Sequence, residues 1–522
     1  MEEEYSVDPA LLLEAATEFA YSPVASSDVS VQEFLNRFPL PAIINTLQTK
    51  ARYPRLEDAL VNTLERIFRT KYGASLIPHF MPFVVVGLGA DSQKVRCLAC
   101  KAVSYLLENT DDTIATNLVI EYGIYPLLLD CLVHGDEQVA KAATDAIKSL
   151  AASSKGLGIV FPLNSSETTH LRNLMGKCSS MGRVRILALI VKLFSVSDSI
   201  ASVIYNSKLL DLLKEEISNA NDTLVTLSVL ELLYELAEVP HSVEFLSKTT
   251  PLQLLSSIIS DESAESILRS RAMMIAGRLL SKENAFMFID ESSSRAVLSA
   301  IDKRFDFQTQ EADECEYALE ALGQIGLTNP GAALVLSSPP VAARHVINAA
   351  FDRQHHNKQL AALHALGNIS GEPRHANNVF LNNEAEECLR HLIYEAASRT
   401  SKLTPLGLLL SVLQQDSEIR MAGYRLITGL VARSWCLTEI LSRQEIIDIV
   451  TDSFTETKKI GMEARHKCCE AIYKALASSK KLLADPALAG IVSKLQEAIK
   501  RGPYLGRRQN EAQPVVVTAE RF

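Results

Sequence analysis

Apolar side chains recur along this chain at the spacing of one face of an α-helix. Counting from Val95, apolar or small residues follow at +3, +4, +7, +8 and +11, namely Leu98, Ala99, Ala102, Val103 and Leu106. The same offsets from Val139, Val225 and Ile419 again select mainly apolar or small residues. Offsets of this kind fall on one stripe of a helix, so each segment predicts an amphipathic helix with one buried face.

Weaker copies of the stripe bring the number of such helices to about ten. The first positions of the ten stripes are residues 56, 95, 139, 184, 225, 268, 314, 358, 419 and 464. Most lie roughly 40–47 residues apart, the period of HEAT and armadillo repeats. No strand-like alternation is sustained. The predicted fold class is therefore all-α, a HEAT/armadillo-type α-solenoid forming a right-handed superhelix of about ten repeats.

A second Leu-rich segment precedes each striped helix, as at residues 126–133 and 406–413, so each repeat is expected to be a helix pair. The long interval between residues 358 and 419 predicts an extra helix or loop within residues 371–404. The expected domain boundaries are an acidic, partly disordered segment at 1–30, with one short amphipathic stretch at 9–19, a continuous solenoid at 31–501 and an extended or disordered tail at 502–522.

The composition supports a folded helical protein. Of 522 residues, 47% are hydrophobic and 22% charged, while aromatic residues make up 6%. The formal net charge of −10 gives no basic footprint for nucleic acid. The acidic start MEEEY is unlike a secretory signal, and apolar runs are too short to cross a membrane. Nine scattered cysteines without an export signal indicate reduced thiols in the cytoplasm or also the nucleus.

No pattern in the sequence predicts catalysis or a cofactor. Cys97 and Cys100 form the nearest thing to a metal motif, but a zinc site needs four converging ligands and no second pair follows. Both cysteines lie inside a striped helix and are expected to be structural. Gly323 and Gly326, near a helix end, are explained by a C-cap or close helix packing. There is no P-loop, HExxH motif or nucleophile elbow. We expect a protein that is not an enzyme.

Arginine follows the first stripe position in five of the ten repeats, at Arg96, Arg185, Arg269, Arg420 and Arg465. Such a ladder has two interpretations. In one, each guanidinium pairs with a carboxylate within the array, such as Asp91 with Arg96 or Asp416 with Arg420. In the other, the guanidinium groups grip acidic side chains of a partner, because an arginine fork matches a carboxylate.

Tyrosines in the striped helices are further candidates. Tyr317, at +3, is expected in the core. Tyr424 and Tyr473 fall off the stripe beside basic neighbours, and tyrosine and arginine dominate interface hot spots. The predicted partner-binding residues are Arg420, Tyr424, Arg425, Arg465, Tyr473 and Lys474, against the alternative of partly solvated surface residues.

Three segments resemble one known family. They are EALGQIGLTNPGAALVL at residues 320–336, VARSW with the only tryptophan at 431–435, and KALASSKKLLADPALAGIVSKLQEAIKRGPYLGRR at 474–508. They are similar to the 26S proteasome non-ATPase regulatory subunit 5 family, HEAT/armadillo-like assembly chaperones, and the likeness looks most concentrated after residue 410. The closing GPY is its most specific part. Leu505 replaces a second tyrosine of the family, and Gly506, Arg507 and Arg508 follow.

The resemblance implies a chaperone in assembly of the base of the 26S regulatory particle. Such a protein binds the C-terminal domain of a proteasomal ATPase subunit in its groove and blocks premature docking on the 20S core. It implies a monomer when free, with no nucleic-acid or membrane partner. The alternative is an armadillo-repeat adaptor for transport or ubiquitin-ligase complexes. One tryptophan instead of a Trp/Asn ladder, and the lack of a U-box, argue against that adaptor.

Overall fold

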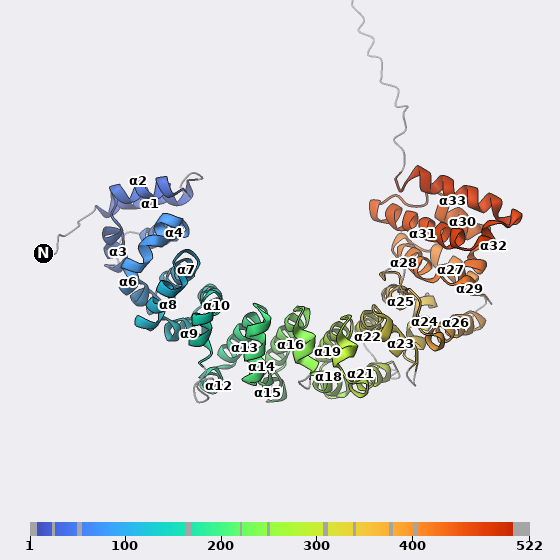
Figure 1. Ribbon diagram of the computed structural model, residues 1–522, viewed down its shortest axis with the longest axis horizontal. Coiled ribbons are helices and arrows are strands. Elements are labelled where there is room, and N and C mark those ends of the chain that lie inside the picture. Colours follow the sequence, from blue (N-terminus) through green and yellow to red (C-terminus); the bar gives the residue numbers. More distant parts are fainter. Residues whose placement is uncertain are drawn as a thin grey trace, which may run out of the picture. The chain divides into compact units, whose positions relative to one another are not determined.

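The computed structural model of this chain is built from helices (Figure 1). It describes residues 8–22, 27–49, 55–162, 170–219, 222–247, 251–305, 312–337, 341–374, 379–399 and 404–504. Within these ranges there are helices, turns and bends and no β-strand. The chain divides into two compact units, Met1–Phe245 and Leu246–Phe522. The predicted all-α, helical-repeat fold is therefore confirmed.

The helices of the first unit are α1 (Pro9–Tyr21), α2 (Asp28–Arg37), α3 (Leu40–Gln48), α4 (Leu56–Arg69), α5 (Lys71–Leu76), η1 (Ile77–Phe80), α6 (Met81–Leu88), α7 (Gln93–Asn109), α8 (Asp112–Glu121), α9 (Ile124–His134), α10 (Glu137–Ala151), α11 (Ser154–Val160), α12 (His170–Met175), α13 (Ser180–Phe194), α14 (Asp198–Asn206), α15 (Asp211–Asn219) and α16 (Thr223–Glu238). Helix α17 (Ser242–Ser247) lies at the division between the units.

Those of the second unit are α18 (Pro251–Ser260), α19 (Ser266–Leu280), α20 (Ala285–Phe288), α21 (Glu291–Lys303), α22 (Ala312–Ile325), α23 (Asn329–Ser337), α24 (Ala343–Phe351), α25 (His356–Ser370), α26 (Asn383–Ser398), α27 (Pro405–Leu413), α28 (Ser417–Leu430), α29 (Ser434–Leu441), α30 (Gln444–Thr451), α31 (Lys459–Ser478), α32 (Lys480–Leu483), η3 (Pro486–Leu488) and α33 (Ala489–Arg501).

All ten striped segments are helices: α4, α7, α10, α13 and α16 in the first unit, and α19, α22, α25, α28 and α31 in the second. We call these ten the H3 helices, because each is the last helix of its repeat. Within each unit, successive H3 helices pack against one another, as α7 does on α10 and α22 on α25. Figure 1 shows these helices side by side in a row within each unit.

The predicted stripes are the buried faces of these helices. In α7, Leu98, Ala99, Ala102, Val103 and Leu106 are each at most 1% exposed. Small residues in the stripe let neighbouring backbones approach, while the leucines fill the space between the rows. Burying one leucine fully stabilises the fold by about 1.5–3 kcal/mol relative to leaving it in water.

Aspartate or serine side chains cap five of the ten H3 helices, namely α7, α10, α13, α16 and α28. Asp136 Oδ1 accepts a hydrogen bond from the Val139 amide at 2.8 Å, and Asp416 Oδ1 accepts from the Ile419 amide at 3.2 Å. Such an N-cap satisfies an amide that has no partner within the helix and contributes about 1 kcal/mol. Asp136 and Asp416, in front of two of the stripes, therefore serve as N-caps of their helices.

Each repeat is more complex than the expected helix pair. Short helices follow most H3 helices and turn the chain back toward the next pair; examples are α8, α14, α20, α23 and α29, of 4 to 10 residues. Three helices per repeat is the armadillo variant of this architecture. Helices this short are marginal in isolation and depend on tertiary packing, which is why the periodic pattern missed them.

The long interval after residue 358 was expected to hold an extra helix or loop; it holds no additional helix, because two helices separate α25 from α28 just as two separate α22 from α25, but α26 has 16 residues where α23 has 9. Before α26, the chain turns at Gly371, whose φ of +96° favours glycine. Arg374 then fastens the turn: its Nη2 donates to the carbonyl oxygens of Gly326, Asn368 and Ile369 at 3.1, 3.0 and 2.6 Å. The turn after α25 is thus tied to the C-terminal ends of α22 and α25.

The packed array begins earlier than the expected boundary at residue 30. The amphipathic stretch at 9–19 is helix α1, which packs on α4 with Leu12 and Ala16 fully buried. Thr63 Oγ1 donates to the Ala16 carbonyl at 3.0 Å. At the other end α33 packs on α31, and residues 505–522, with Arg507 and Arg508, lie outside the described residues.

No single helix of the described chain is both long and apolar enough to cross a membrane. One bent pair, α8 with α9, reaches that length and hydropathy together, but its two helices turn by 74° at the break between them.

Candidate functional site

The H3 helices carry the arginine ladder, and its first members are held within the array. Arg96 Nη2 donates to Asp130 Oδ2 on α9 at 3.1 Å, not to the expected Asp91. Arg185 Nη1 donates to the last-turn carbonyls of α9 and to the Gly135 oxygen, the latter at 2.6 Å. Arg185 thus satisfies carbonyls at the C-terminal end of α9, and Arg96 pairs with a side-chain carboxylate of the same helix.

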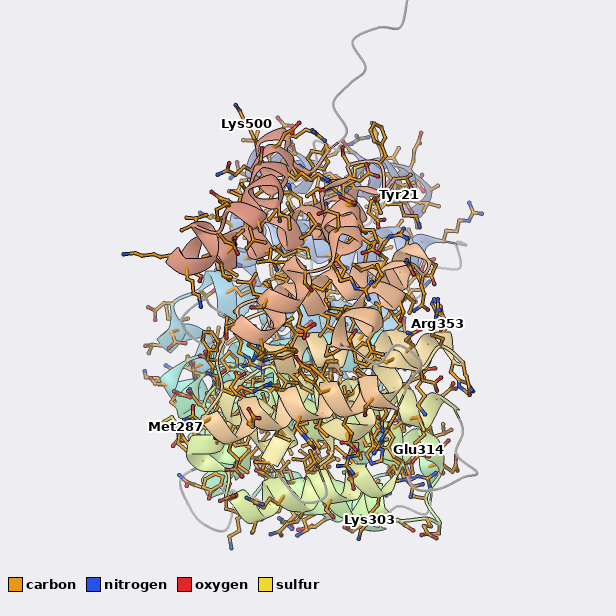
Figure 2. All side chains as sticks on the ribbon, turned by 90° about the vertical axis from the view of Figure 1, so that its right-hand side faces the viewer. Tyr21, Met287, Lys303, Glu314, Arg353 and Lys500 are labelled. Atoms are coloured by element: carbon orange, nitrogen blue, oxygen red, sulfur yellow. The ribbon has the colours of Figure 1, made fainter. Side chains whose placement is uncertain are left out.

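Arg269 lies in a buried charge cluster of the second unit. It makes a two-point contact with Glu314, Nε to Oε1 and Nη2 to Oε2, both at 2.9 Å. Arg304 Nε donates to the same carboxylate at 2.8 Å. Glu314, labelled in Figure 2, is 2% exposed. Burial alone would raise the pKa of Glu314, but the hydrogen bonds and charges of the two arginines outweigh it and lower the pKa.

Arg420 and Tyr424 converge on Glu456 in the loop before α31. Arg420 Nε donates to Glu456 Oε1 at 2.5 Å, and the Tyr424 hydroxyl donates to the same oxygen at 3.2 Å. Glu456 is 1% exposed and Tyr424 fully buried. Burial raises the pKa of Tyr424 well above its ordinary range, so the phenol stays protonated. The expectation that Tyr424 faces a partner is wrong, because the loop covers it.

Arg465 is likewise a core residue, at 1% exposure. Its Nη1 donates to the Val450 carbonyl at 2.8 Å and its Nη2 to the Pro503 carbonyl at 3.4 Å. It therefore cannot grip a partner either. All five ladder arginines bind carbonyls or carboxylates of this chain, which favours the structural interpretation of the ladder.

Three predicted residues do retain solvent access. Tyr473 is half-buried, and its hydroxyl accepts a hydrogen bond from Gln496 Nε2 at 2.8 Å. Lys474 is exposed. Arg425 is partly exposed but already paired with Glu372, Nη2 to Oε2 at 3.0 Å. Of the six predicted contact residues, only Tyr473 and Lys474 offer an open surface.

Tyr317 was expected in the core, and the structure places it at the surface. It is 43% exposed, although its +3 position suggested the core. In α22 the buried positions are Ala318, Ala321, Leu322 and Ile325, so +3 lies at the margin of the stripe. The sequence pattern alone gave too wide a stripe here.

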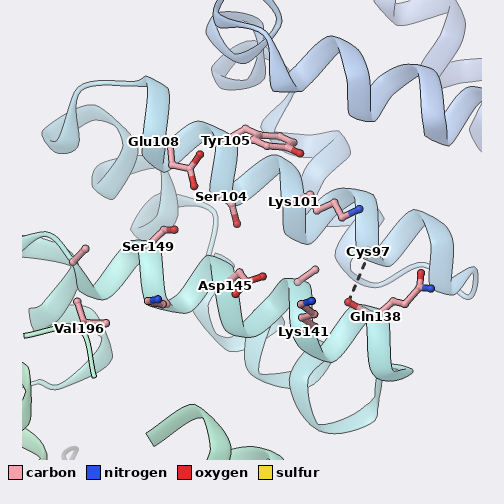
Figure 3. Close-up of a pocket in the computed structure, with 13 residues that line it drawn as sticks. Cys97, Lys101, Ser104, Tyr105, Glu108, Gln138, Lys141, Asp145, Ser149 and Val196 are labelled. Atoms are coloured by element: carbon pink, nitrogen blue, oxygen red, sulfur yellow. Dashed lines mark hydrogen bonds between the residues drawn. The ribbon is translucent and has the colours of Figure 1, made fainter. Parts of the chain in front are cut away.

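A groove of about 800 Å³ runs between α7 and α10 in the first unit (Figure 3). Its lining alternates in charge: Lys101, Lys141 and Lys148 lie among Glu108 and Asp145. Lys101 Nζ is held at 2.8 Å from a carboxylate oxygen of Glu65 on α4. A mixed polar lining on two rigid helices suits a polar protein surface better than an apolar small molecule.

The CxxC pair borders this groove without forming a metal site. Cys97 and Cys100 are buried in α7, and Cys97 Sγ contacts the Gln138 carbonyl at 3.8 Å (Figure 3). Burial raises the pKa of Cys97 and disfavours the thiolate that binds metal. Across the described residues, no group of three His, Cys, Asp or Glu could hold a metal ion.

A second groove, of about 460 Å³, lies between α22 and α25 in the second unit. Glu316, Glu320 and Gln324 of α22 form one wall, and His364 and Asn368 of α25 line the other. Pattern analysis did not single out any of these five residues, because polar positions off the stripe carry no periodic signal.

Comparison with known proteins shows which families and proteins this chain is similar to. The profile of the family described as proteasome non-ATPase 26S subunit matches residues 40–277. The 26S proteasome non-ATPase regulatory subunit 5 of Mus musculus is 24% identical over 199 residues, 38% of this chain and 38% of that protein. The alignment thus spans well under two thirds of the mouse protein. The likeness is carried by the first part of the chain, where it had looked diffuse.

Among solved structures, importin beta matches with a TM-score of 0.53 and 14% identity, over 95% of this chain and 62% of importin beta. At that identity the match shows the fold alone. An engineered protein matches 82% of the chain and 98% of its own at 15% identity and a TM-score of 0.43. The resemblance expected from the sequence is confirmed by the family profile and the mouse protein: part of this chain is similar to the 26S proteasome non-ATPase regulatory subunit 5 family.

Proposed function

We propose that this protein is an assembly chaperone for the base of the 26S proteasome regulatory particle. It binds the C-terminal domain of a proteasomal ATPase subunit and keeps that domain from docking prematurely on the 20S core. The family match over residues 40–277 carries the proposal. It acts in the cytoplasm and the nucleus, as a monomer when free.

The geometry supports action by binding rather than by catalysis. Successive H3 helices are fastened by packed stripes and by ion pairs such as Arg269–Glu314 and Arg420–Glu456. A surface held in this way is formed before the partner arrives, so little conformational entropy is lost on binding. A bound scaffold then blocks the partner's next contact sterically, which needs no chemistry of its own.

Affinity purification of the tagged full chain from native extract, followed by mass spectrometry, tests this function. We expect proteasomal ATPase subunits to be recovered together with the chain, and the chain to be missing from finished 26S particles. Recovery only in finished particles, or without any proteasome subunit, would contradict the chaperone role.

A charge-reversal variant tests whether the groove between α7 and α10 contacts the partner. Lys141 lines the groove of the first unit, and Lys177 is exposed on a loop outside it. If the groove holds the partner, Lys141→Glu lowers recovery of the ATPase subunits several-fold and Lys177→Glu leaves it unchanged. Equal recovery with both variants would remove this groove from the contact surface, while the chaperone role itself would stand.

A further inference from the structure

The groove between α22 and α25 has an unbalanced charge. Glu316 and Glu320 both line it, one helical turn apart on α22, and neither forms an ion pair or hydrogen bond with any described residue. Burial, with the nearby Asp313 carboxylate, raises the pKa of Glu316, and burial also raises the pKa of Glu320. Glu316 is half-buried and Glu320 exposed, so their desolvation is partial, and it disfavours the charged forms because no cation among the described residues opposes it.

The same wall contains an unused hydrogen-bond acceptor. Gln324 lies one turn beyond Glu320, and its Oε1 atom is buried with no hydrogen-bond partner among the described residues. A buried acceptor left unsatisfied costs about 1–3 kcal/mol. The acceptors of Glu316, Glu320 and Gln324 thus have no donor among the described residues.

The amide of Asn357 also lines the groove, but the described part of the opposite wall offers no free cation. Arg425 reaches the groove, but its Nε and Nη2 donate to Glu372 at 3.3 and 3.0 Å. Its Nη1 lies 2.7 Å from His364 Nδ1, which accepts because the arginine cannot. Burial and the charge of Arg425 lower the pKa of His364, so the imidazole is neutral. The guanidinium is satisfied and balanced, and the groove keeps its negative charge.

We propose that this groove binds a basic segment of a partner protein, with an arginine or lysine side chain donating to Glu316, Glu320 and Gln324. An arginine fits best, since its planar fork can meet two carboxylates or a carboxylate and an amide oxygen together. The proposal deepens the chaperone function and rests on it only for the partner's identity.

Two matched peptides probe the site on the full-length chain. One is a fluorescein-labelled, alanine-based peptide with arginines one helical turn apart, and the other carries uncharged citrulline in their place. We expect fluorescence anisotropy to give at least about tenfold tighter binding of the arginine peptide. The double variant E316Q/E320Q should lose that preference.

The control removes the same charge elsewhere in the second unit. Glu384 and Glu418 are exposed, form no ion pair among the described residues and lie outside the groove. The variant E384Q/E418Q should keep the full preference for arginine. Equal binding of the two peptides to the wild type, or equal losses in the two double variants, would overturn the proposal.

The two experiments distinguish a wrong groove proposal from a wrong chaperone proposal. If the wild type prefers the arginine peptide but recovers no proteasomal ATPase from extract, the chaperone function is wrong and the groove stands. If the wild type and E316Q/E320Q recover the ATPase equally and bind the arginine peptide equally, the groove proposal is wrong and the chaperone function stands.

Discussion

At the scale of single residues, the charges that matter to this fold are those taken out of water. Arg269, Arg304 and Glu314 form one buried cluster, and Arg420 with Glu456 forms another. Arg269–Glu314 and Arg420–Glu456 each join residues about one repeat apart, so these two pairs fasten one repeat to the next. Removing one partner of a buried pair leaves an uncompensated charge, which costs more than the pair itself contributes.

The first prediction concerns Glu456→Ala. It leaves Arg420 without its carboxylate and Tyr424 without its acceptor, and should lower the free energy of unfolding by about 3–5 kcal/mol, measured by urea denaturation. Tyr424→Phe removes one neutral donor and should cost only about 1 kcal/mol. Equal losses in the two variants would show that the ion pair does not stabilise this repeat.

A second prediction follows from the lowered pKa of Glu314. A carboxyl whose pKa is lower folded than unfolded contributes stability above its ordinary value of 4.5, and that contribution is lost as the pH falls through the lower, folded-state pKa. Glu314→Gln should therefore be less stable than the wild type by about 3 kcal/mol at neutral pH. The difference should shrink steadily below pH 4.5 in denaturation curves. A difference independent of pH would contradict this account.

At the scale of the helices, glycine allows neighbouring helices to pack closely. A Cβ atom added to Gly323 of α22 would lie 2.7 Å from Ala365 Cα and 2.8 Å from Ala365 Cβ of α25, closer than van der Waals contact permits. Gly277 of α19 has the same relation to Ala321 of α22, at 3.0 Å. Close helix packing, one of the two explanations open for Gly323, is what the structure shows.

Gly323→Ala is accordingly predicted to push α22 and α25 apart and lower the free energy of unfolding by about 1–3 kcal/mol. The control is Gly490→Ala in α33, where a Cβ atom would meet nothing within 4 Å. There alanine's higher helix propensity should be neutral or stabilising by up to about 1 kcal/mol. Thermal denaturation of both variants checks the pair, and a neutral Gly323→Ala would mean that the helices can separate freely.

At the scale of the whole molecule, stability should be local. In a repeat array each repeat contacts its neighbours only, so a defect should spread one or two repeats and no further. Hydrogen exchange measures this directly. In Glu456→Ala we expect faster amide exchange in α28, α30 and α31, and unchanged exchange in α7 and α10. Uniformly faster exchange would indicate a single cooperative fold instead.

The periodic pattern was sufficient for the H3 helices because their spacing is a local property. Every striped segment is a helix. The type of secondary structure and its period follow from which side chains are buried. Residues three, four and seven positions apart carry that information. The repeat fold could be predicted on this basis, whereas the family was expected only from the resemblance of three short segments.

What only the tertiary structure decided is which off-stripe residues stay in water. Tyr424 was expected on the surface and is covered by the loop that carries Glu456, while Tyr317 was expected in the core and is exposed. Arg96 pairs with Asp130, not with Asp91. Each outcome depends on a segment from the adjoining repeat, a distance over which sequence spacing carries no signal. The grooves arise likewise, because their walls are two helices whose polar faces meet only after the stripes are buried.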